Sequence, residues 1–458
     1  MRLVLLLLCL GLCLQSFASS ESLEKKKYYY SALNEFFLET YGKQITVKIA
    51  DRLEHLLFFT GIEILEDYDQ DLLDKYPTSS TRFILARRLF QKKDYARTLD
   101  YLAKVHPDHR YYPESLLLKA QVFGDQNNPD KEVEAYKGCQ LAALKEHNKS
   151  PNEKIKRYYR MVFEICVVNK ARRLFNQGKI KESIEAYDQI PKKSYKWPYI
   201  LLEKAWAYYS LGDFNRALGL LVTYKSPLLE TYFFPEAEYL AALSYFRLCL
   251  YHDSMVIVAQ YYNSYRPRFN QLEKVLSQNR TSQNYFYNLM FRSGDELKKQ
   301  DPFVRDMITR LKKQTRFSLD FNTIYKIKRE MKLIQAKEKN DVKAQLLEHL
   351  VSVNQNMISK INYNAKSDIF KFLESVHFFS SELFKINLEI ISKKKDLVYS
   401  NRKLVADRSR GDYSNVNRSR FEYFWKFEGD FWADELGDYS LGLQSNCQTV
   451  RVEDEEKN

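Results

Sequence analysis

Apolar residues recur every three or four positions through most of the chain, which is the period of amphipathic helices. Within these stretches small residues fall at a regular interval, at Ala86, Ala120, Ala171, Ala205 and Ala242. Their separations are 34, 51, 34 and 37 residues. Self-similarity at such a period indicates helix pairs that stack and bury a continuous core between neighbours.

The clearest repeat unit spans residues 197–227. It places Ala205 in a first helix, Gly212 at a turn and Ala217 in a second helix. The glycine permits the backbone conformation of a tight turn between helices. Weaker units keep the same spacing and place other residues at the turn, namely Lys93, Gly178 and Cys249. The 34-residue period predicts an all-α fold of tetratricopeptide (TPR) type, an α-solenoid over residues 28–267.

Two departures from the period have local interpretations. The 51-residue separation predicts an insertion of about half a repeat near Lys145–Lys156, with residues 147–152 as a loop. Residues 28–76 are expected to form one or two degenerate leading repeats.

The first helix of each repeat lines the concave face of such a solenoid, which is its usual binding surface. Positions three before, one after and four after each aligned alanine should face this groove. They are Phe83, Arg87 and Phe90, then Val168, Arg172 and Phe175, then Leu202, Trp206 and Tyr209, and finally Tyr239, Leu243 and Phe246. Aromatic residues with arginine between them suit an extended peptide or an amphipathic helix. The alternative is that these side chains pack between repeats or are covered by the protein's own later helices.

Residues 268–410 form a second region with long helical patterns. Apolar residues recur at intervals of three and four residues, at Ile324, Ile327, Met331 and Ile334. A similar run extends from Ile369 to Ile390. We expect amphipathic helices there, as a helical hairpin or a short coiled coil, although Ser380 and Asn387 would fall in the seam of a heptad register.

The C-terminal region, residues 418–449, has a different pattern. Phe421, Tyr423, Trp425 and Phe427 alternate with other residues at the period of a strand, and a second strand-like stretch runs from Tyr439 to Cys447. We expect a small β-rich, aromatic cap. Its aromatic side chains either pack on the helices or form an exposed docking face.

Composition and charge narrow the class of protein. The 458 residues contain only 13 glycines and 11 prolines, which favours helices over turn-rich β folds. The formal charge is +13, and residues 301–412 hold 23 Lys and Arg against 14 Asp and Glu. A basic surface suits an anionic partner such as peptidoglycan or a lipid surface, and the alternative is a solvated helix face.

The first 18 residues predict export. Arg2 precedes the apolar run Leu3–Leu14, and Ser16-Phe17-Ala18 fits a cleavage site. Leu12 occupies the position before Cys13 where a lipoprotein signal needs a small residue, so we expect a soluble, periplasmic protein rather than a lipid-anchored one. Export also makes nucleic acid an unsuitable partner.

Four cysteines remain after cleavage, too few for a disulfide framework in so long a chain. Cys139 and Cys166 are the closest pair in sequence and could form one disulfide. Buried free thiols are the alternative.

No pattern predicts catalysis, a cofactor or a metal site. The seven histidines form no His-Glu-x-x-His arrangement, and the chain has no Gly-x-Ser-x-Gly or paired Cys-x-x-Cys. His106-Pro107-Asp108-His109 could resemble a metal site, but a surface turn between repeat helices is the better interpretation. We therefore expect a binding protein and not an enzyme.

Two segments resemble a known family. Phe234-Pro235-Glu236-Ala237-Glu238-Tyr239-Leu240-Ala241-Ala242-Leu243 and Phe427-Glu428-Gly429-Asp430-Phe431-Trp432-Ala433-Asp434-Glu435-Leu436-Gly437-Asp438-Tyr439 resemble segments of periplasmic TPR proteins of gliding and predatory bacteria, some of them gliding-motility components of the cell envelope. The resemblance implies a scaffold that binds protein partners in the envelope. The alternative function is binding of the cell wall or outer membrane through the basic helical segment.

Overall fold

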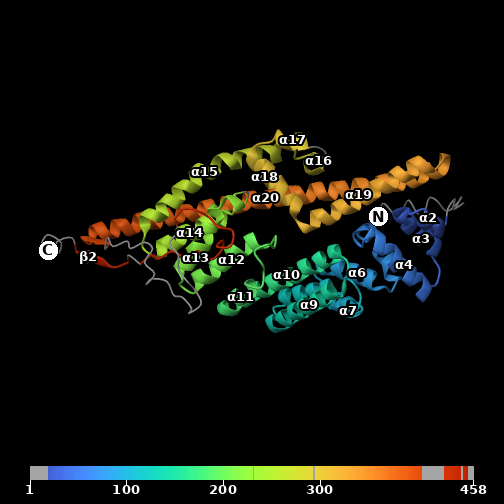
Figure 1. Ribbon diagram of the computed structural model, residues 1–458, viewed down its shortest axis with the longest axis horizontal. Helices are drawn as coiled ribbons and strands as arrows, with labels where there is room; N and C mark the ends of the chain where they lie inside the picture. Colours follow the sequence, from blue (N-terminus) through green and yellow to red (C-terminus); the bar gives the residue numbers. More distant parts are fainter. Residues whose placement is uncertain (1–18, 231, 292–293, 405–427, 445–446, 452–458) are drawn as a thin grey trace. The chain divides into compact units, whose positions relative to one another are not determined.

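The computed structural model describes residues 19–230, 232–291, 294–404, 428–444 and 447–451 (Figure 1). The expected signal peptide, residues 1–18, lies outside these ranges, as do residues 418–427 of the expected cap. Regular structure in the described residues is almost entirely helical, so the chain is an all-α protein.

Contacts within the chain group it into two compact units. The first unit comprises residues 1–122, 282–296 and 308–365, and the second comprises residues 123–281, 297–307 and 366–458. The sequence predicted a division near residue 267 instead. The grouping differs because apolar residues beyond that point complete both cores, with Ile327 and Leu350 in the first unit and Leu383 and Ile390 in the second.

The elements of the first unit are short helices followed by a long one. They are α2 (Ser20–Lys25), α3 (Tyr29–Thr40), α4 (Val47–Thr60), the 3-10 helix η1 (Glu63–Asp67), α5 (Gln70–Asp74), α6 (Ser79–Gln91), α7 (Tyr95–Ala103), α16 (Tyr285–Phe291) and α19 (Thr315–Lys337). Some helices contribute residues to both units, namely α8 (Tyr112–Asp125), α17 (Gly294–Lys298), α18 (Pro302–Lys313) and α20 (Asn340–Tyr399).

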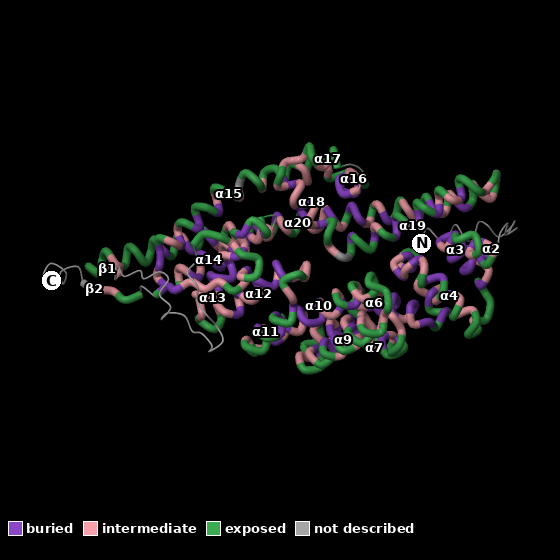
Figure 2. The backbone as a smooth tube through the Cα atoms, in the orientation of Figure 1, coloured by how far each residue is buried: buried purple, intermediate pink, exposed green. Residues whose placement is uncertain are grey.

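The second unit contains further helix pairs and a pair of short strands. Its elements are α9 (Pro129–Lys149), α10 (Glu153–Asn176), α11 (Ile180–Tyr187), α12 (Trp197–Ser210), α13 (Phe214–Val222), η2 (Thr223–Lys225), η3 (Pro227–Leu229), α14 (Pro235–Arg247), α15 (Tyr251–Gln278), β1 (Arg402–Leu404) and β2 (Thr449–Arg451). The later half of α15 is largely exposed, whereas buried residues recur along α12 and α14 (Figure 2).

Among the described residues, none of the helices combines the length and the hydrophobicity that crossing a membrane requires.

The same turn joins the helices of five pairs. In each, a residue seven positions after an aligned alanine has a positive φ: Lys93 (61°), Asn127 (53°), Gly178 (74°), Gly212 (77°) and Cys249 (57°). The backbone N–H of the next residue donates to the carbonyl five residues back, as from Asp213 to Tyr208 at 2.9 Å. This is the Schellman arrangement that ends a helix. All five aligned alanines are fully buried, so they occupy equivalent positions in pairs α6–α7, α8–α9, α10–α11, α12–α13 and α14–α15.

The 51-residue interval differs in detail from the expected loop insertion. Helix α9 extends to Lys149 and α10 begins at Glu153, so only residues 150–152 separate them. The extra residues lengthen these two helices, which pack against each other and are joined by a disulfide between Cys139 and Cys166. The expected loop at residues 147–152 is therefore wrong for residues 147–149.

Two charged side chains of α19 hold it against α3 and α4. One binds the N-terminus of α3 and the other binds the C-terminus of α4. The buried Glu330 carboxylate accepts the backbone N–H groups of Tyr30 (3.0 Å) and Ser31 (2.9 Å) and the Ser31 hydroxyl (2.7 Å). At the C-terminus of α4, Lys326 Nζ donates to the Phe59 carbonyl at 2.7 Å. Orphan N–H groups at a helix N-terminus and carbonyls at a C-terminus are thus satisfied from a third helix.

The described part of the C-terminal cap is mostly an extended strap. Only its last residue, Thr449, belongs to a strand, β2, which pairs antiparallel with β1. The prediction of a second strand from Tyr439 to Cys447 is wrong, because the described residues of that stretch contain no strand. The strap crosses α13 instead. The Leu441 N–H donates to the Asn215 carbonyl, and the Asn215 amide exchanges two hydrogen bonds with the Leu443 backbone. Alternation of apolar and polar residues fits any extended chain that buries one side, whether or not another strand lies beside it.

A glycine permits the close approach of this strap. A Cβ atom at Gly219 of α13 would lie 1.8 Å from the Tyr439 carbonyl oxygen, so the position cannot hold a side chain without moving the strap. Leu436 and Leu443 of the strap are buried in the core of the second unit. A second disulfide, Cys249–Cys447, fastens its end.

Candidate partner-binding surfaces

The groove residues expected in the first unit have partners within that unit. Phe83 is buried and stacks on Tyr111, with ring centroids 5.7 Å apart. Arg87 forms a 2.8 Å ion pair with Glu66, and the Phe90 ring contacts Tyr95. These side chains pack between helices more than they line an open surface.

In the second unit, the expected groove residues of α10 and α12 join neighbouring helices. Arg172 Nε donates to Glu203 at 2.9 Å, and this hydrogen bond raises the pKa of the arginine. Trp206 Nε1 donates to Glu236 of α14 at 2.8 Å. Leu202 and Val168 are buried, and Phe175 is partly buried. The polar groups of the expected groove residues therefore form hydrogen bonds with the next helix pair, from Arg172 to Glu203 and from Trp206 to Glu236.

Three expected groove residues form an aromatic cluster. The Trp206 ring lies 5.6 Å from Tyr209 and 6.2 Å from Tyr239, and Arg247 donates to the Tyr209 hydroxyl at 3.0 Å. Tyr239 also contacts Phe379 of α20 at 5.6 Å. The other two expected groove residues of α14 also have neighbours: Leu243 packs on the core and Phe246 contacts Tyr251. At α14 the protein's own later helix thus covers part of the expected groove, while Trp206 and Tyr209 stay partly exposed.

Residues 366–399 of α20 have two apolar faces. The inner face, with Val376, Leu383, Ile386 and Ile390, is buried against α12–α15. Hydroxyl groups of α15 reinforce it, since Tyr261 donates to the Val376 carbonyl at 2.9 Å and Tyr262 to the Ser380 carbonyl at 2.8 Å. This face anchors the helix within the second unit.

The outer face of the same stretch is apolar and exposed. Phe370, Phe384, Ile391 and Val398 follow one another at intervals of 14, 7 and 7 residues, and exposed His377 fills the remaining heptad position. Leu388 lies between Phe384 and Ile391. The exposed fractions of the apolar side chains run from 49% at Leu388 to 77% at Val398. We call these six residues the outer stripe.

Lysines and carboxylates both border the outer stripe. Lys371, Lys385, Lys393, Lys394 and Lys395 are exposed on the same stretch of helix, and so are Glu374, Glu389 and Asp396. Lys385 forms an ion pair with Glu382, one turn away. Contiguous exposed apolar residues with a charged rim are typical of protein or membrane contact sites.

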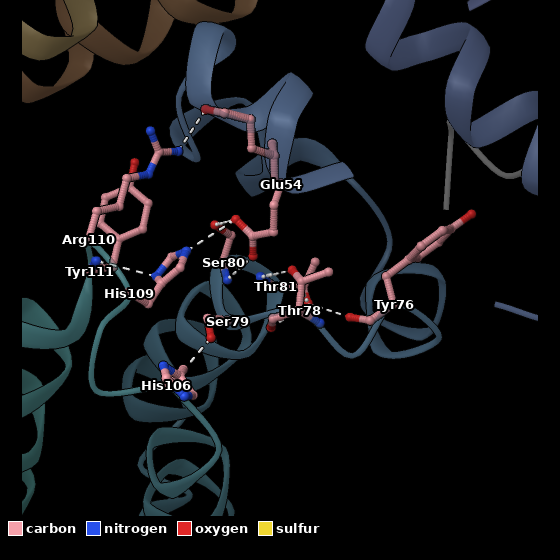
Figure 3. A network of polar contacts seen from close by, with 11 residues as sticks. Glu54, Tyr76, Thr78, Ser79, Ser80, Thr81, His106, His109, Arg110 and Tyr111 are labelled. Atoms are coloured by element: carbon pink, nitrogen blue, oxygen red, sulfur yellow. Dashed lines mark hydrogen bonds and ion pairs between the residues drawn. The ribbon is translucent and has the colours of Figure 1, made fainter. Parts of the chain in front are cut away.

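The histidines at the turn between α7 and α8 have a structural role. Figure 3 shows His109 Nε2 beside the Glu54 carboxylate at 3.1 Å, while Ser80 donates to the same carboxylate through its backbone N–H (2.8 Å) and its hydroxyl (2.6 Å). The His106 backbone N–H donates to Ser79 Oγ. The hydrogen bonds from His109 and Ser80 outweigh burial and lower the pKa of Glu54 to about 2. Glu54 of α4 thus accepts an N–H group at the start of α6, and His109 of the turn supports its carboxylate. Among the described residues no cluster of three or more potential metal ligands occurs.

The sequence reasoning missed the outer stripe and the Cys249–Cys447 disulfide. The seven-residue interval was readable in the sequence, but an apolar stripe alone does not reveal whether it is buried. The disulfide joins residues 198 positions apart, and no local signal links them.

The chain matches no protein-family model, and no curated protein is similar enough in sequence to indicate a relationship.

Proposed function

We propose that the chain is an exported, non-enzymatic scaffold of TPR type that binds protein partners in the bacterial cell envelope. The observation that carries the proposal is the outer stripe of α20. A helix that is apolar on two faces normally buries both, and here the second face lies exposed between charged residues of both signs. The heptad spacing of the stripe supports one occupant best, an amphipathic helix of another protein with charged residues of both signs flanking its apolar face.

The repeat supports the TPR assignment. Five helix pairs share one turn and one buried alanine position, at intervals of 34, 51, 34 and 37 residues. Such repeats hold long helices on a rigid frame, which suits a scaffold. The resemblance of two segments to gliding-motility components makes a motility complex one setting for it.

The cysteines support export. The four cysteines that follow the predicted signal are joined as Cys139–Cys166 and Cys249–Cys447. Disulfides persist in oxidising compartments such as the bacterial periplasm and are rare in the cytosol.

The alternative function, binding to the cell wall or the outer membrane, has one observation in its favour. Lys393, Lys394 and Lys395 form an exposed basic run at the end of α20. An anionic polymer or lipid surface held by these lysines would be released by salt, because exposed charges are screened at high ionic strength.

The test is capture of partners from an envelope extract by residues 19–458 at low and high salt. The wild type is compared with Phe384→Ser/Leu388→Ser in the outer stripe, with Trp206→Ala/Tyr209→Ala in the groove, and with Tyr363→Ser as a matched exposed control on the earlier half of α20. We expect a protein that is retained at high salt, weakened at least about tenfold by the outer-stripe variant and unaffected by the other two.

Two other results would count against the proposal. Loss of the partner in the groove variant alone would assign binding to Trp206 and Tyr209. Capture of cell-wall or lipid material alone, released by salt, would favour the basic run.

A further inference from the structure

A small cavity in the second unit lies apart from the outer stripe. It is lined by residues of α13, η2, the segment 232–234, α14 and α15, it is partly open, and its volume is about 100 Å³. Pockets for whole drug-sized ligands measure roughly 300–1,000 Å³. The cavity therefore suits a group the size of one side chain.

Aromatic rings make up much of the lining. Tyr224, Tyr232, Phe233, Phe234 and Tyr265 all line it. The Phe234 ring lies 5.1 Å from Tyr224 and stacks at 6.3 Å with Tyr232. The Tyr265 ring packs against Phe233 at 3.8 Å and stacks on Tyr261 at 4.6 Å. The faces of aromatic rings carry negative electrostatic potential and attract cations.

One carboxylate faces this aromatic lining. Glu238, in the first turn of α14, lines the cavity and accepts a hydrogen bond of 3.4 Å from the Tyr265 hydroxyl. Burial raises the pKa of Glu238, against the opposing charge of Lys225. A carboxylate in an apolar surrounding is stabilised by a cation that enters beside it.

Lys225 is the cation at the edge of the cavity. It lines the cavity from η2, yet its side chain is exposed. Its charge would compete with an entering cation but would attract an anion. Removing the charge of Lys225 should therefore strengthen binding of a cation and weaken binding of an anion.

We infer that the cavity formed by Glu238 and the rings of Tyr224, Phe233, Phe234 and Tyr265 binds an organic cation of side-chain size, presented as a lysine or arginine residue of a partner. The aromatic rings line the space that the cation enters, and Glu238 neutralises its charge. The site is independent of the outer stripe, so either can fail without the other.

The experiment titrates residues 19–458 with four probes by calorimetry: the N-acetyl methylamides of lysine, arginine and norleucine, and tetramethylammonium. We expect binding of the cations and little binding of neutral norleucine. Glu238→Gln should weaken binding of the cations about tenfold or more, as a desolvated cation–π site with a lost charge implies. Lys225→Ala should strengthen it.

Glu236→Gln is the matched control. Glu236 lies in the same helical turn, accepts a hydrogen bond from Trp206 and does not line the cavity, so its variant should bind like the wild type. Preference for tetramethylammonium over both amino-acid probes would support the cation site but assign it to a free quaternary ammonium group. Equal binding of norleucine, no binding of any cation, or loss of binding in Lys225→Ala would each overturn the inference.

Discussion

The two units are stabilised by different chemistry. In the described residues of the first unit, carboxylates of other helices satisfy helix N-termini, with Glu330 at α3 and Glu54 at α6. The second unit holds both disulfides, Cys139–Cys166 and Cys249–Cys447. Carboxylates lose their charge in acid and disulfides are cleaved by reductant, so the two units should respond to different conditions.

The long helices show the same contrast. Charged contacts at Glu330 and Lys326 bind α19 to helix ends and fix its position. Apolar contacts and tyrosine hydroxyls hold residues 366–399 of α20, which also expose the outer stripe. The second unit thus carries apolar surface beyond what its own core uses.

The largest expected effect is loss of the long-range disulfide. Cys249→Ser/Cys447→Ser should destabilise the second unit by up to about 5 kcal/mol, because the closed loop spans 198 residues. Hydrogen exchange should rise in the strap at residues 428–444, with protection in the first unit unchanged.

Cys139→Ser/Cys166→Ser serves as the comparison. The disulfide that it removes closes a loop of 27 residues, so the free energy of unfolding should fall by less, up to about 4 kcal/mol. Equal loss of protection in both units on reduction would contradict the contrast between them.

A somewhat smaller effect is expected at the buried carboxylate of α19. Glu330→Ala removes three hydrogen bonds and leaves two buried N–H groups at the start of α3 without partners. The free energy of unfolding of the first unit should fall by about 3 kcal/mol. Chemical denaturation measures it, with exposed Glu348→Ala as the control; a loss no larger than that control would rule out capping by Glu330.

Acid should act on the first unit through Glu54. Its pKa is lowered from 4.5 to about 2, so its contribution is complete above pH 4.5 and is lost as the pH falls toward 2. The ionised Glu54 contributes about 2–3 kcal/mol to the free energy of unfolding of the first unit. Unfolding measured between pH 6 and pH 2.5 should show a shallower pH dependence in Glu54→Gln, and an unchanged slope would remove Glu54 from the explanation.

The smallest effect on stability is expected at the outer stripe. Phe384→Ser/Leu388→Ser should lower the free energy of unfolding by about 1–2 kcal/mol, because both side chains are about half exposed and serine is a poorer helix former than leucine. A thermal melt checks this. A loss of several kcal/mol would mean that the stripe is covered within the folded protein and is not available to a partner.

Local features of the fold were predictable from the sequence. The aligned alanines marked equivalent positions in five helices because a close helix crossing excludes large residues. The turn residue was predicted after four of them, at Lys93, Gly178, Gly212 and Cys249. Residues 439–444 of the strap were misread as part of a strand because the same alternation serves both structures. Their true neighbour, Asn215, is far away in sequence.

The binding surfaces were less predictable because they depend on non-local packing. The position of Tyr239 in its repeat was correctly aligned, but nothing near it in sequence indicates that Phe379 lies against it. The two faces of α20 look alike in sequence, since both are apolar at helical intervals. Only packing distinguishes buried Leu383 from exposed Phe384.

The most direct test of the outer stripe is photo-crosslinking in intact cells of the source organism. A benzoylphenylalanine residue replaces Phe384, Ile391, Trp206 or Tyr363 in separate variants. The account predicts one protein adduct shared by positions 384 and 391 and absent at 206 and 363. An adduct at position 206 with none at 384 and 391 would contradict it and return the binding site to the groove.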